Sequence, residues 1–235
     1  MKSGTVFLIP VFLSDTSSNN VFPNDNMETI SGLDNFIVEN LRTARRFLRK
    51  VGFKKDFDKI NFYELNEHTD PSEIYSYLID VKKGEDIGLM SEAGIPCVAD
   101  PGYQIVSLAH QHGIDVKPLI GPSSILLALM GSGFNGQQFV FHGYLPIDKS
   151  ERRKTILNIE NIARKSNQTQ IFIETPYRNN KLLADILSFC TDNTMLCIAA
   201  NITGKYEFIK TKSIGQWKKT KIDLHKKPTV FLING

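Results

Sequence analysis

The chain alternates between two hydrophobic patterns along its whole length. Short runs of β-branched and aromatic residues predict strands, and apolar residues at helical spacing predict helices. The expected strands are 5–9, 35–38, 61–64, 87–90, 115–119, 139–141, 170–174, 194–199 and 229–233. The expected helices lie near 41–51, 72–82, 103–112, 123–131, 151–165 and 178–189. Strands that alternate with helices of this length are typical of an α/β protein with largely parallel sheets.

Two polar or glycine-rich segments interrupt this alternation. The turn-rich stretch from Gly131 to Gln138 predicts a division into an N-terminal α/β lobe, 1–133, and a C-terminal α/β lobe, 134–235. Residues 14–29 are polar and predict a loop that is unusually long for a compact domain. Loops of that length act as binding loops or serve only as connectors, and the sequence leaves both open.

Composition narrows the class of protein. With 235 residues, 41% of them hydrophobic, the chain has enough apolar material for a core, which excludes intrinsic disorder. The three cysteines are widely spaced, which indicates neither a disulfide framework nor a zinc site. There is no convincing export signal, and no apolar run approaches the ~20 residues that span a bilayer. We therefore expect a soluble cytoplasmic protein without a membrane segment or a metal.

The net charge of +3 conceals a local cluster of arginines. Between Arg42 and Lys55 there are seven basic residues and no acidic one. Arg42, Arg45, Arg46 and Arg49 share one face of the expected helix. Such a face suits phosphate groups, but it is equally compatible with a solvated surface. The lysine-rich segment 205–227 is more typical of a solvated surface.

Two loops at expected strand ends carry the candidate chemistry. Residues 89–102 contain the small residues Ser91, Ala93 and Gly94 just after a strand, where ligands of α/β sheets bind. Residues 119–124 read Leu-Ile-Gly-Pro-Ser-Ser and open a helix, where the serines either cap the helix or bind a ligand. Neither the dinucleotide-binding nor the P-loop glycine pattern occurs in the chain. The loops alone do not distinguish one cofactor from another.

The order of short motifs along the chain resembles the tetrapyrrole methylase superfamily, the class III S-adenosylmethionine-dependent methyltransferases. Within it the sequence is most similar to the branch of ribosomal RNA small subunit methyltransferase I. The segments that carry the resemblance are 4–10, 38–43, 65–68, 91–96, 99–103, 121–124, 141–146, 173–178 and 203–207. Together they cover nearly the whole chain in the order of the family.

The resemblance implies a class III methyltransferase fold of two α/β lobes, a homodimer, and S-adenosylmethionine bound in the cleft between lobes. The residues that it places against the cofactor come from both lobes. They are Pro10, Ser91, Glu92, Ala93, Ile95, Ser123 and Ser124 in the first lobe, and Ile173, Glu174, Ala200, Asn201, Pro228 and Thr229 around the adenine in the second.

The acceptor side is expected to use acidic and basic residues. A ribose hydroxyl must lose its proton, for which Glu39 and Glu67 are candidate bases, and Arg42 is a candidate for positioning a phosphate. A structural hydrogen bond or ion pair remains the alternative for each. The branch's usual Glu-Asp-Thr-Arg is here Glu39-Asn40-Leu41-Arg42, and its loop after the first strand is replaced.

These observations predict a methyltransferase that modifies a ribose 2′-hydroxyl in small-subunit ribosomal RNA. The departures on the acceptor side keep two alternatives open. One is methylation of a tetrapyrrole or another small molecule, and the other is a non-catalytic binding module that retains the cofactor fold.

Overall fold

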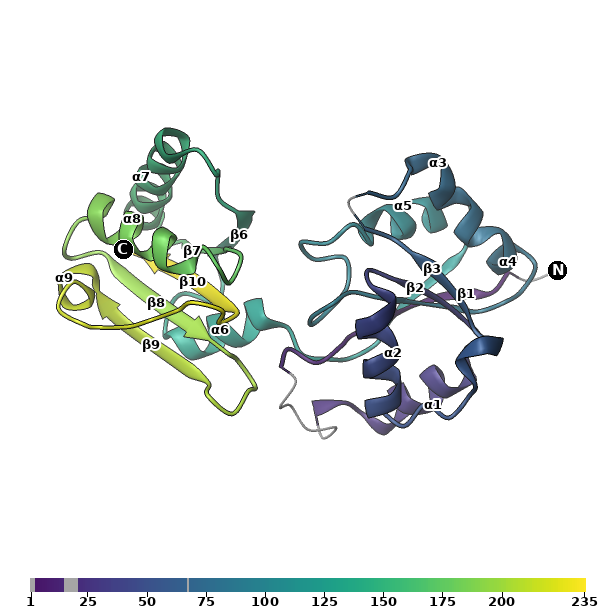
Figure 1. Ribbon diagram of the computed structural model, residues 1–235. Helices are drawn as coiled ribbons and strands as arrows, with labels where there is room; N and C mark the ends of the chain where they lie inside the picture. Colours follow the sequence, from purple (N-terminus) through teal and green to yellow (C-terminus); the bar gives the residue numbers. More distant parts are fainter. Residues whose placement is uncertain (1–2, 15–20, 67) are drawn as a thin grey trace. The chain divides into compact units, whose positions relative to one another are not determined.

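The computed structural model describes residues 3–14, 21–66 and 68–235. Its internal contacts divide the chain into two compact units, Met1–Ser123 and Ser124–Gly235 (Figure 1). The sequence analysis put the division after residue 133, at the glycine-rich turn. Helix α6, Ser124–Ser132, precedes that turn and packs onto the sheet of the second unit.

The first unit is built on a fully parallel sheet. Its strands are β1 Thr5–Ile9, β2 Asn35–Val38, β3 Asn61–Glu64, β4 Ile87–Met90 and β5 Asp115–Pro118, in the order β3-β2-β4-β1-β5. Every pairing in it is parallel, so all five carboxyl ends lie at one edge. That edge is where α/β sheets bind their ligands.

Helices cover both faces of this sheet, because the strands are apolar on both sides. Phe36 belongs to the core under α1 Asn24–Gly32 and α2 Leu41–Lys50, and its neighbour Ile37 belongs to the opposite core. That opposite core lies under the short helices α3 Pro71–Ile74, η3 Tyr75–Leu78 and α4 Ile79–Lys82, and under α5 Tyr103–Gln111. A 3-10 helix, η2 Phe57–Lys59, precedes β3.

One expectation for this unit was wrong in part, and a second holds with a division of the element. Part of the expected loop 14–29 belongs to helix α1, in which Asn26 and Ile30 are buried. Because this helix buries few side chains, its sequence is polar and shows no helical period. Residues 15–20 of the expected loop lie outside the described residues. The expected helix 72–82 is divided into α3, η3 and α4.

The second unit has a mixed sheet of five strands. These are β6 Phe139–Tyr144, β7 Thr169–Ile173, β8 Met195–Ala200, β9 Phe208–Ser213 and β10 Thr229–Asn234, in the order β6-β7-β10-β8-β9. Strands β6 and β7 run parallel, and the other three pairs are antiparallel. The α/β class is confirmed. Strand β9 was not expected, because its alternating lysines gave the segment the character of a solvated surface.

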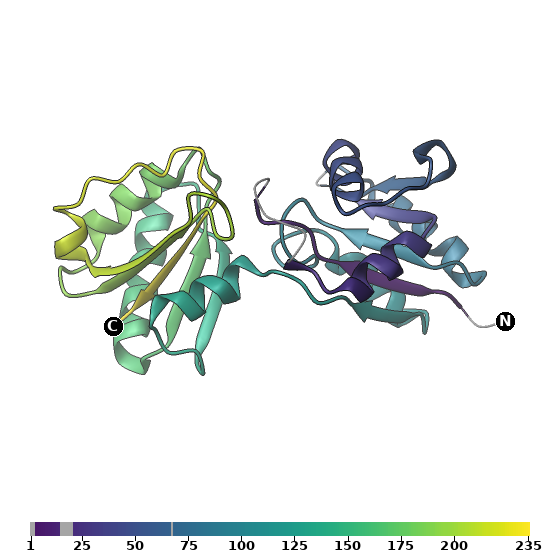
Figure 2. The same cartoon turned by 90° about the horizontal axis from the view of Figure 1, so that it is seen from below.

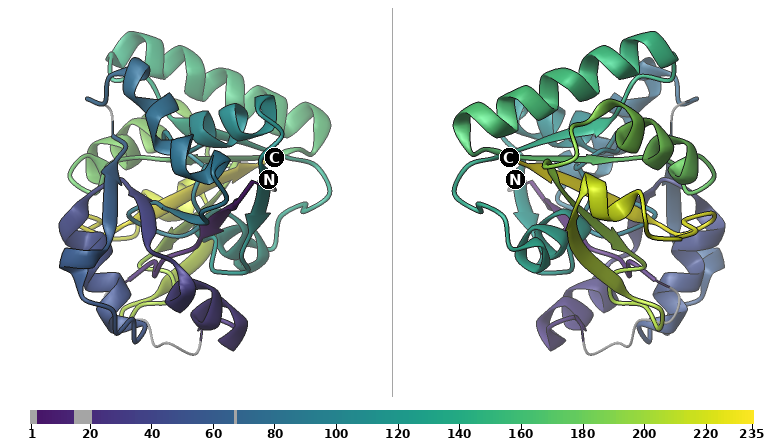
Figure 3. Two further views of the ribbon diagram at one scale, coloured as in Figure 1. Left: turned by 90° about the vertical axis from the view of Figure 1, so that its right-hand side faces the viewer. Right: turned by 90° about the vertical axis from the view of Figure 1, so that its left-hand side faces the viewer.

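Three longer helices enclose this sheet, with α7 Lys149–Ser166 and α8 Asn179–Phe189 on one face and α6 on the other (Figure 1). Figures 2 and 3 show the helices and strands of each unit from other sides. The short helix α9, Ile214–Trp217, carries the buried Trp217 into the core between the sheet and α8. Each unit therefore has a complete three-layer core of its own.

Candidate functional site

Three candidate residues follow neighbouring strands at the ligand edge of the first sheet. In register, Ile9 lies beside Met90, and Met90 lies beside Val38. The next residues along the three strands are Pro10, Ser91 and Glu39, which are distant in the sequence. The structure thus places the candidate base Glu39 beside the loop expected to hold the cofactor.

A small pocket lies where these strands end. It has an empty volume of about 180 Å³, and its walls come from the ends of β2 and β4 and from the loop before α5. The lining residues are Val38, Glu39, Leu65, Leu89, Met90, Ser91, Asp100, Pro101 and Gly102. The hydroxyl of Ser91 and the Oδ2 atom of Asp100 are buried there without a hydrogen-bond partner among the described residues. Leaving such groups unpaired costs about 1–3 kcal/mol each, so the pocket is suited to a polar ligand.

Glu39 lines this pocket with a carboxyl group whose pKa is shifted. Its Oε2 atom accepts a hydrogen bond of 3.1 Å from the backbone N–H of Glu92. Burial raises the pKa of Glu39 above its usual value, and the nearby carboxylates of Glu92 and Asp100 raise it further. A carboxylate with a raised pKa is a stronger base than an exposed one, which suits removal of a proton from a hydroxyl.

Asp100 organises the loop between β4 and α5, and the sequence analysis did not select it. Its Oδ1 atom accepts hydrogen bonds from the backbone N–H groups of Cys97, at 3.0 Å, and Gly102, at 2.7 Å. Burial raises the pKa of Asp100 as well. In the sequence it stood within the candidate loop 89–102 and the family segment 99–103, where its place in Asp-Pro-Gly indicated only a turn.

The same loop holds unusual backbone conformations. Cys97 and Ala99 have φ angles of 69° and 64°, in the left-handed region that residues with a side chain seldom adopt. Conformations of this kind persist where the surroundings enforce them, and they concentrate at functional sites. Burial raises the pKa of the Cys97 thiol to about 12, which disfavours the reactive thiolate form.

Glycines let the loops at this edge pack directly against each other. A Cβ atom on Gly121 would lie 2.2 Å from Cγ of Pro10, so only glycine fits beside that proline. The carbonyl of Gly94 accepts a hydrogen bond of 2.8 Å from the N–H of Val11. The loops after β1, β4 and β5 therefore form one continuous surface.

The other expected residues of the first unit differ in exposure. Ser123 is buried, Ile95 is partly buried, and Glu92 and Ala93 are exposed. Ser124 is the first residue of α6 in the second unit. The candidate base Glu67 lies outside the described residues.

The start of helix α2 shows that Asn40 keeps a structural role. Its Oδ1 atom accepts hydrogen bonds from the backbone N–H groups of Arg42, at 3.0 Å, and Thr43, at 3.2 Å. Asparagine and aspartate cap helices about equally well, so this helix start does not need the carboxylate that the branch usually carries. The hydroxyl of Thr43 also donates to a carboxylate oxygen of Glu92, at 3.3 Å, which ties α2 to the cofactor loop.

The arginine face of α2 is divided between packing and exposure. Arg45 lies over the rings of Phe57 and Phe62, with distances of 5.5 and 5.3 Å from its guanidinium carbon to the ring centres. Arg49 lies 3.9 Å from the centre of Phe57. Arg42 and Arg46 are exposed. Two of the four guanidinium groups therefore stabilise the fold, and two are available to a ligand.

The six candidate residues of the second unit lie together at one edge of its sheet. Thr229 pairs with Ala200, and Val230 pairs with Ile173, so the ends of β7 and β8 adjoin the start of β10. The N–H of Asn201 donates to the carbonyl of Pro228, at 2.9 Å. Glu174, the remaining candidate, follows β7 directly.

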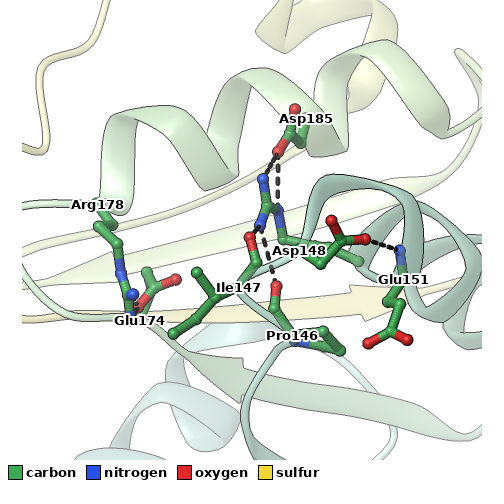
Figure 4. A network of polar contacts seen from close by, with 8 residues as sticks. Pro146, Ile147, Asp148, Glu151, Glu174, Arg178 and Asp185 are labelled. Carbon is green, nitrogen blue, oxygen red and sulfur yellow. Dashed lines mark hydrogen bonds and ion pairs between the residues drawn. The ribbon is translucent and has the colours of Figure 1, made fainter.

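Two ion pairs, one buried and one partly exposed, hold the loops of this edge (Figure 4). The Oε1 atom of Glu174 accepts hydrogen bonds from Nε and Nη2 of Arg178, at 3.0 and 2.7 Å. Arg152 donates to Oδ2 of Asp185 from Nε and Nη2, at 2.8 and 2.6 Å. Its Nη1 donates to the carbonyls of Pro146 and Ile147, which fixes the loop after β6. The carboxylate of Glu174 thus organises its own loop.

Within residues 3–14, 21–66 and 68–235, no group of three or more His, Cys, Asp or Glu side chains is placed to hold a metal ion. No helix in these ranges is long and apolar enough to cross a membrane.

The fold and the site agree with a comparison to known families. The model of the family Tetrapyrrole (Corrin/Porphyrin) Methylases matches residues 29–217, so the chain belongs to that family. It is an S-adenosylmethionine-dependent methyltransferase. The enzyme class and cofactor expected from the motifs are confirmed.

Individual relatives define the branch of the family. The Ribosomal RNA small subunit methyltransferase I of Thermotoga maritima is 33% identical over 187 residues, 79% of this chain and 79% of the relative. The protein of that name from Buchnera aphidicola is 29% identical over 99% of this chain and 78% of its own length. The resemblance stated from the sequence is confirmed.

Solved structures show the same fold at low identity. The methyltransferase CobJ has a TM-score of 0.65 at 12% identity, covering 100% of this chain and 95% of its own. The cobalt precorrin-4 methyltransferase CbiF has a TM-score of 0.61 at 10% identity, covering 98% and 94%.

The residues at the first edge fit the cofactor. The unpaired atoms of Ser91 and Asp100 need a polar partner, and Gly121 lets the loop after β5 pack directly against Pro10. The pocket is small, so it accounts for only part of the ligand.

Proposed function

We propose that this methyltransferase methylates a ribose 2′-hydroxyl in small-subunit ribosomal RNA. The position of Glu39 carries the proposal. Its carboxyl group, with a raised pKa, lines the same pocket as Ser91 in the cofactor loop. Support for the substrate comes from relatives named Ribosomal RNA small subunit methyltransferase I, two of which match 79% and 99% of this chain.

In this reaction the protein must mainly orient the acceptor hydroxyl and provide a base. S-adenosylmethionine supplies a methyl group activated by the sulfonium to which it is bonded. Holding the hydroxyl oxygen in line with that bond is worth ~7–11 kcal/mol in favourable cases. Glu39 would take the hydroxyl proton as the oxygen–carbon bond forms and the carbon–sulfur bond breaks, which leaves the donor sulfur as a neutral thioether. Arg42, exposed in the first turn of the helix after Glu39, binds a neighbouring phosphate.

The cofactor contacts remain those implied by the family. In the first unit Pro10, Ser91, Glu92, Ala93 and Ile95 bind the methionine and ribose parts, with Ser123 and Ser124 at the polar end. In the second unit the strand ends that carry Ile173, Glu174, Ala200, Asn201, Pro228 and Thr229 bind adenine. The pairing of those strands supports their acting together.

Two further parts of the proposal concern assembly and location. We expect a homodimer, as the family resemblance implies, which sedimentation analysis tests by a mass twice that of the 26.5 kDa chain. We also expect the protein to be located in the cytoplasm, where small ribosomal subunits are available as substrate.

The second candidate is methylation of a tetrapyrrole. The observation in its favour is the fold, because the structures of CobJ and CbiF match nearly the whole chain. A third alternative, a binding module without catalysis, is favoured by the replaced loop after Pro10.

One experiment separates the three. Purified protein is incubated with S-adenosylmethionine carrying a labelled methyl group, together with either unmethylated small ribosomal subunits or a mixture of tetrapyrrole precursors. We expect label in the ribosomal RNA, and none when Glu39→Gln replaces the wild type. Calorimetry should show that Glu39→Gln still binds the cofactor. Label in the tetrapyrroles alone refutes the ribosomal substrate, and cofactor binding without transfer to either acceptor supports the binding module.

A further inference from the structure

Three tyrosines are exposed at one edge of the second unit's sheet. Tyr177 follows β7 and is 70% exposed, Tyr206 lies between β8 and β9 and is 73% exposed, and Tyr144 at the end of β6 is 54% exposed. The strand register puts all three at the same end of the sheet, because Tyr144 lies beside Ile173 and Ala200 lies beside Phe208, with Tyr144 on the outer strand β6 and Tyr206 just before the other outer strand, β9. Large aromatic side chains this exposed are candidates for a binding surface.

The loops that carry these tyrosines are joined to the loop before β10. The N–H of Lys226 donates to the carbonyl of Pro176, at 3.0 Å. The ammonium of Lys226 lies 5.9 Å from the ring centre of Tyr177, and the ring of His225 meets the same tyrosine edge-on at 5.8 Å. On the other loop, the ammonium of Lys205 lies 5.6 Å from the ring centre of Tyr206. Each of these two tyrosines therefore has a lysine beside its ring.

The charge around this edge is positive. The loops at this edge carry Lys205, Lys226 and Lys227 and two acidic residues, Glu207 and Asp223, whereas β9 leads the chain away from this edge, from Phe208 to Ser213. Both carboxylates are engaged within the chain. Glu207 accepts a hydrogen bond of 2.7 Å from the N–H of Thr203, and Asp223 accepts one of 2.7 Å from the side chain of Asn180. These bonds hold the carboxylates in place, and three lysines against two carboxylates leave the loops with a small positive excess.

The backbone of these loops is held in conformations that cost energy. Asn201, Thr203 and Lys226 have φ angles of 52°, 63° and 58°, all in the left-handed region. Such conformations are retained where the surrounding structure enforces them, and they cluster at ligand sites. The loops between β8 and β9 and before β10 are therefore preorganised for a ligand.

We propose that this surface, the tyrosine edge (Tyr144, Tyr177, Lys205, Tyr206 and Lys226), binds a single-stranded segment of the RNA substrate. Unpaired bases stack on the rings of Tyr177 and Tyr206, and the neighbouring lysines bind the phosphates. This inference rests on the proposed RNA substrate and adds a binding site outside the residues assigned to the cofactor. A second copy of the chain is a poor occupant, because a symmetric contact at this edge would bring its lysines together.

The test measures binding of RNA without any methyl transfer. A short fluorescently labelled single-stranded RNA is titrated with wild-type protein, Tyr177→Ala and Tyr206→Ala, and fluorescence anisotropy is recorded. Loss of one stacked base weakens binding by about fivefold or more, so each variant should lose at least that much. Tyr177→Phe keeps the ring and should bind as the wild type does. Tyr103→Ala, which removes a tyrosine 60% exposed in the first unit, is the matched control.

Two further measurements identify the nature of the contact. Tyr177→Ala should leave the salt dependence of binding unchanged, whereas Lys226→Gln should lower its logarithmic slope by about 0.7, the value for one phosphate on a single strand. A fully paired duplex of the same sequence should bind equally well to wild type and Tyr177→Ala, because its bases are not available for stacking.

Several results overturn the inference. One is a loss in Tyr177→Ala and Tyr206→Ala no larger than that in Tyr103→Ala, with wild-type circular dichroism in all three. A second is an unchanged RNA affinity with a changed sedimentation mass, which assigns the edge to contact between copies. Wild-type protein that methylates ribosomal RNA while its tyrosine variants bind normally removes only this inference. Tyrosine-dependent RNA binding without methyl transfer removes only the proposed function.

Discussion

The ion pair between Arg152 and Asp185 allows the sharpest prediction for stability (Figure 4). Arg152 is 3% exposed and Asp185 is 8% exposed, and the arginine supplies four hydrogen bonds at 2.6–3.0 Å, two of them to the carboxylate. In Arg152→Leu the carboxylate of Asp185 stays buried without its cation, and two loop carbonyls lose their donor. Breaking a buried pair on one side costs about 3–5 kcal/mol, so we expect that loss in the free energy of unfolding.

The single tryptophan makes this loss measurable in the second unit alone. Trp217 is fully buried there, and its indole N–H donates to the carbonyl of Leu196, at 2.9 Å. Its fluorescence during urea unfolding therefore reports that unit. A loss of about 4 kcal/mol with a slope of about 2 kcal/mol per molar urea lowers the midpoint by roughly 2 M.

Two further variants make the interpretation testable. Lys218→Ala removes the exposed pair between Lys218 and Asp192, which is worth about 0–1 kcal/mol, so its midpoint should barely move. Adding Asp185→Leu to Arg152→Leu removes the stranded charge and should recover stability relative to Arg152→Leu. The reasoning is refuted if Arg152→Leu loses no more than Lys218→Ala, or if the double variant is less stable than Arg152→Leu.

Four other predictions follow from single contacts. Gly121→Ala places a methyl group against Pro10, and we expect calorimetry to show a loss of S-adenosylmethionine affinity on the order of tenfold, while Gly136→Ala, with open space around it, binds normally. Asp100→Asn removes a negative charge that raises the pKa of Glu39, so the increase of the methyl-transfer rate with pH should move to lower pH; an unchanged or upward-shifted profile contradicts Glu39 as the base. The raised pKa also means that Glu39 adds stability below its unfolded pKa, and this contribution is lost as pH rises through its folded pKa. Above that range we expect thermal unfolding to show that Glu39→Gln is stabilised relative to the wild type. Arg45→Ala loses its stacking on Phe57 and Phe62 and should lower the free energy of unfolding of the first unit by about 1 kcal/mol in hydrogen exchange, whereas the exposed Arg46→Ala should change it little.

Local patterns were sufficient for much of the secondary structure. The strands of the first unit are short apolar runs bounded by polar residues, and β1 to β4 lie where these runs predict them. Helix α1 and strand β9 were missed because few of their side chains are buried, and burial is what creates a hydrophobic period. Mixed, largely parallel sheets were expected, but which strands pair antiparallel was not predicted, since strand direction depends on how distant segments meet.

The sequence likewise identified some parts of the candidate site and missed others. The order of motifs was enough to identify the family and the methyl donor, because each motif is local and can be read residue by residue. The same reading selected Glu39, yet it offered no reason to prefer that residue to Glu67. Asp100 remained inside a turn motif, with no sign that one of its oxygens is buried and unpaired.

By itself the sequence determined the α/β class, the positions of most strands and helices, the methyltransferase family and its cofactor. Only the tertiary structure decided which side chains meet. The parallel register of β2 and β4 brings Glu39 beside Ser91, packing on aromatic rings removes Arg45 from the arginine face, and the meeting of three loops creates the tyrosine edge. The physical reason is that hydrophobic periodicity records whether a residue is buried, whereas pKa shifts, unpaired atoms and shared surfaces depend on neighbours far away in the chain.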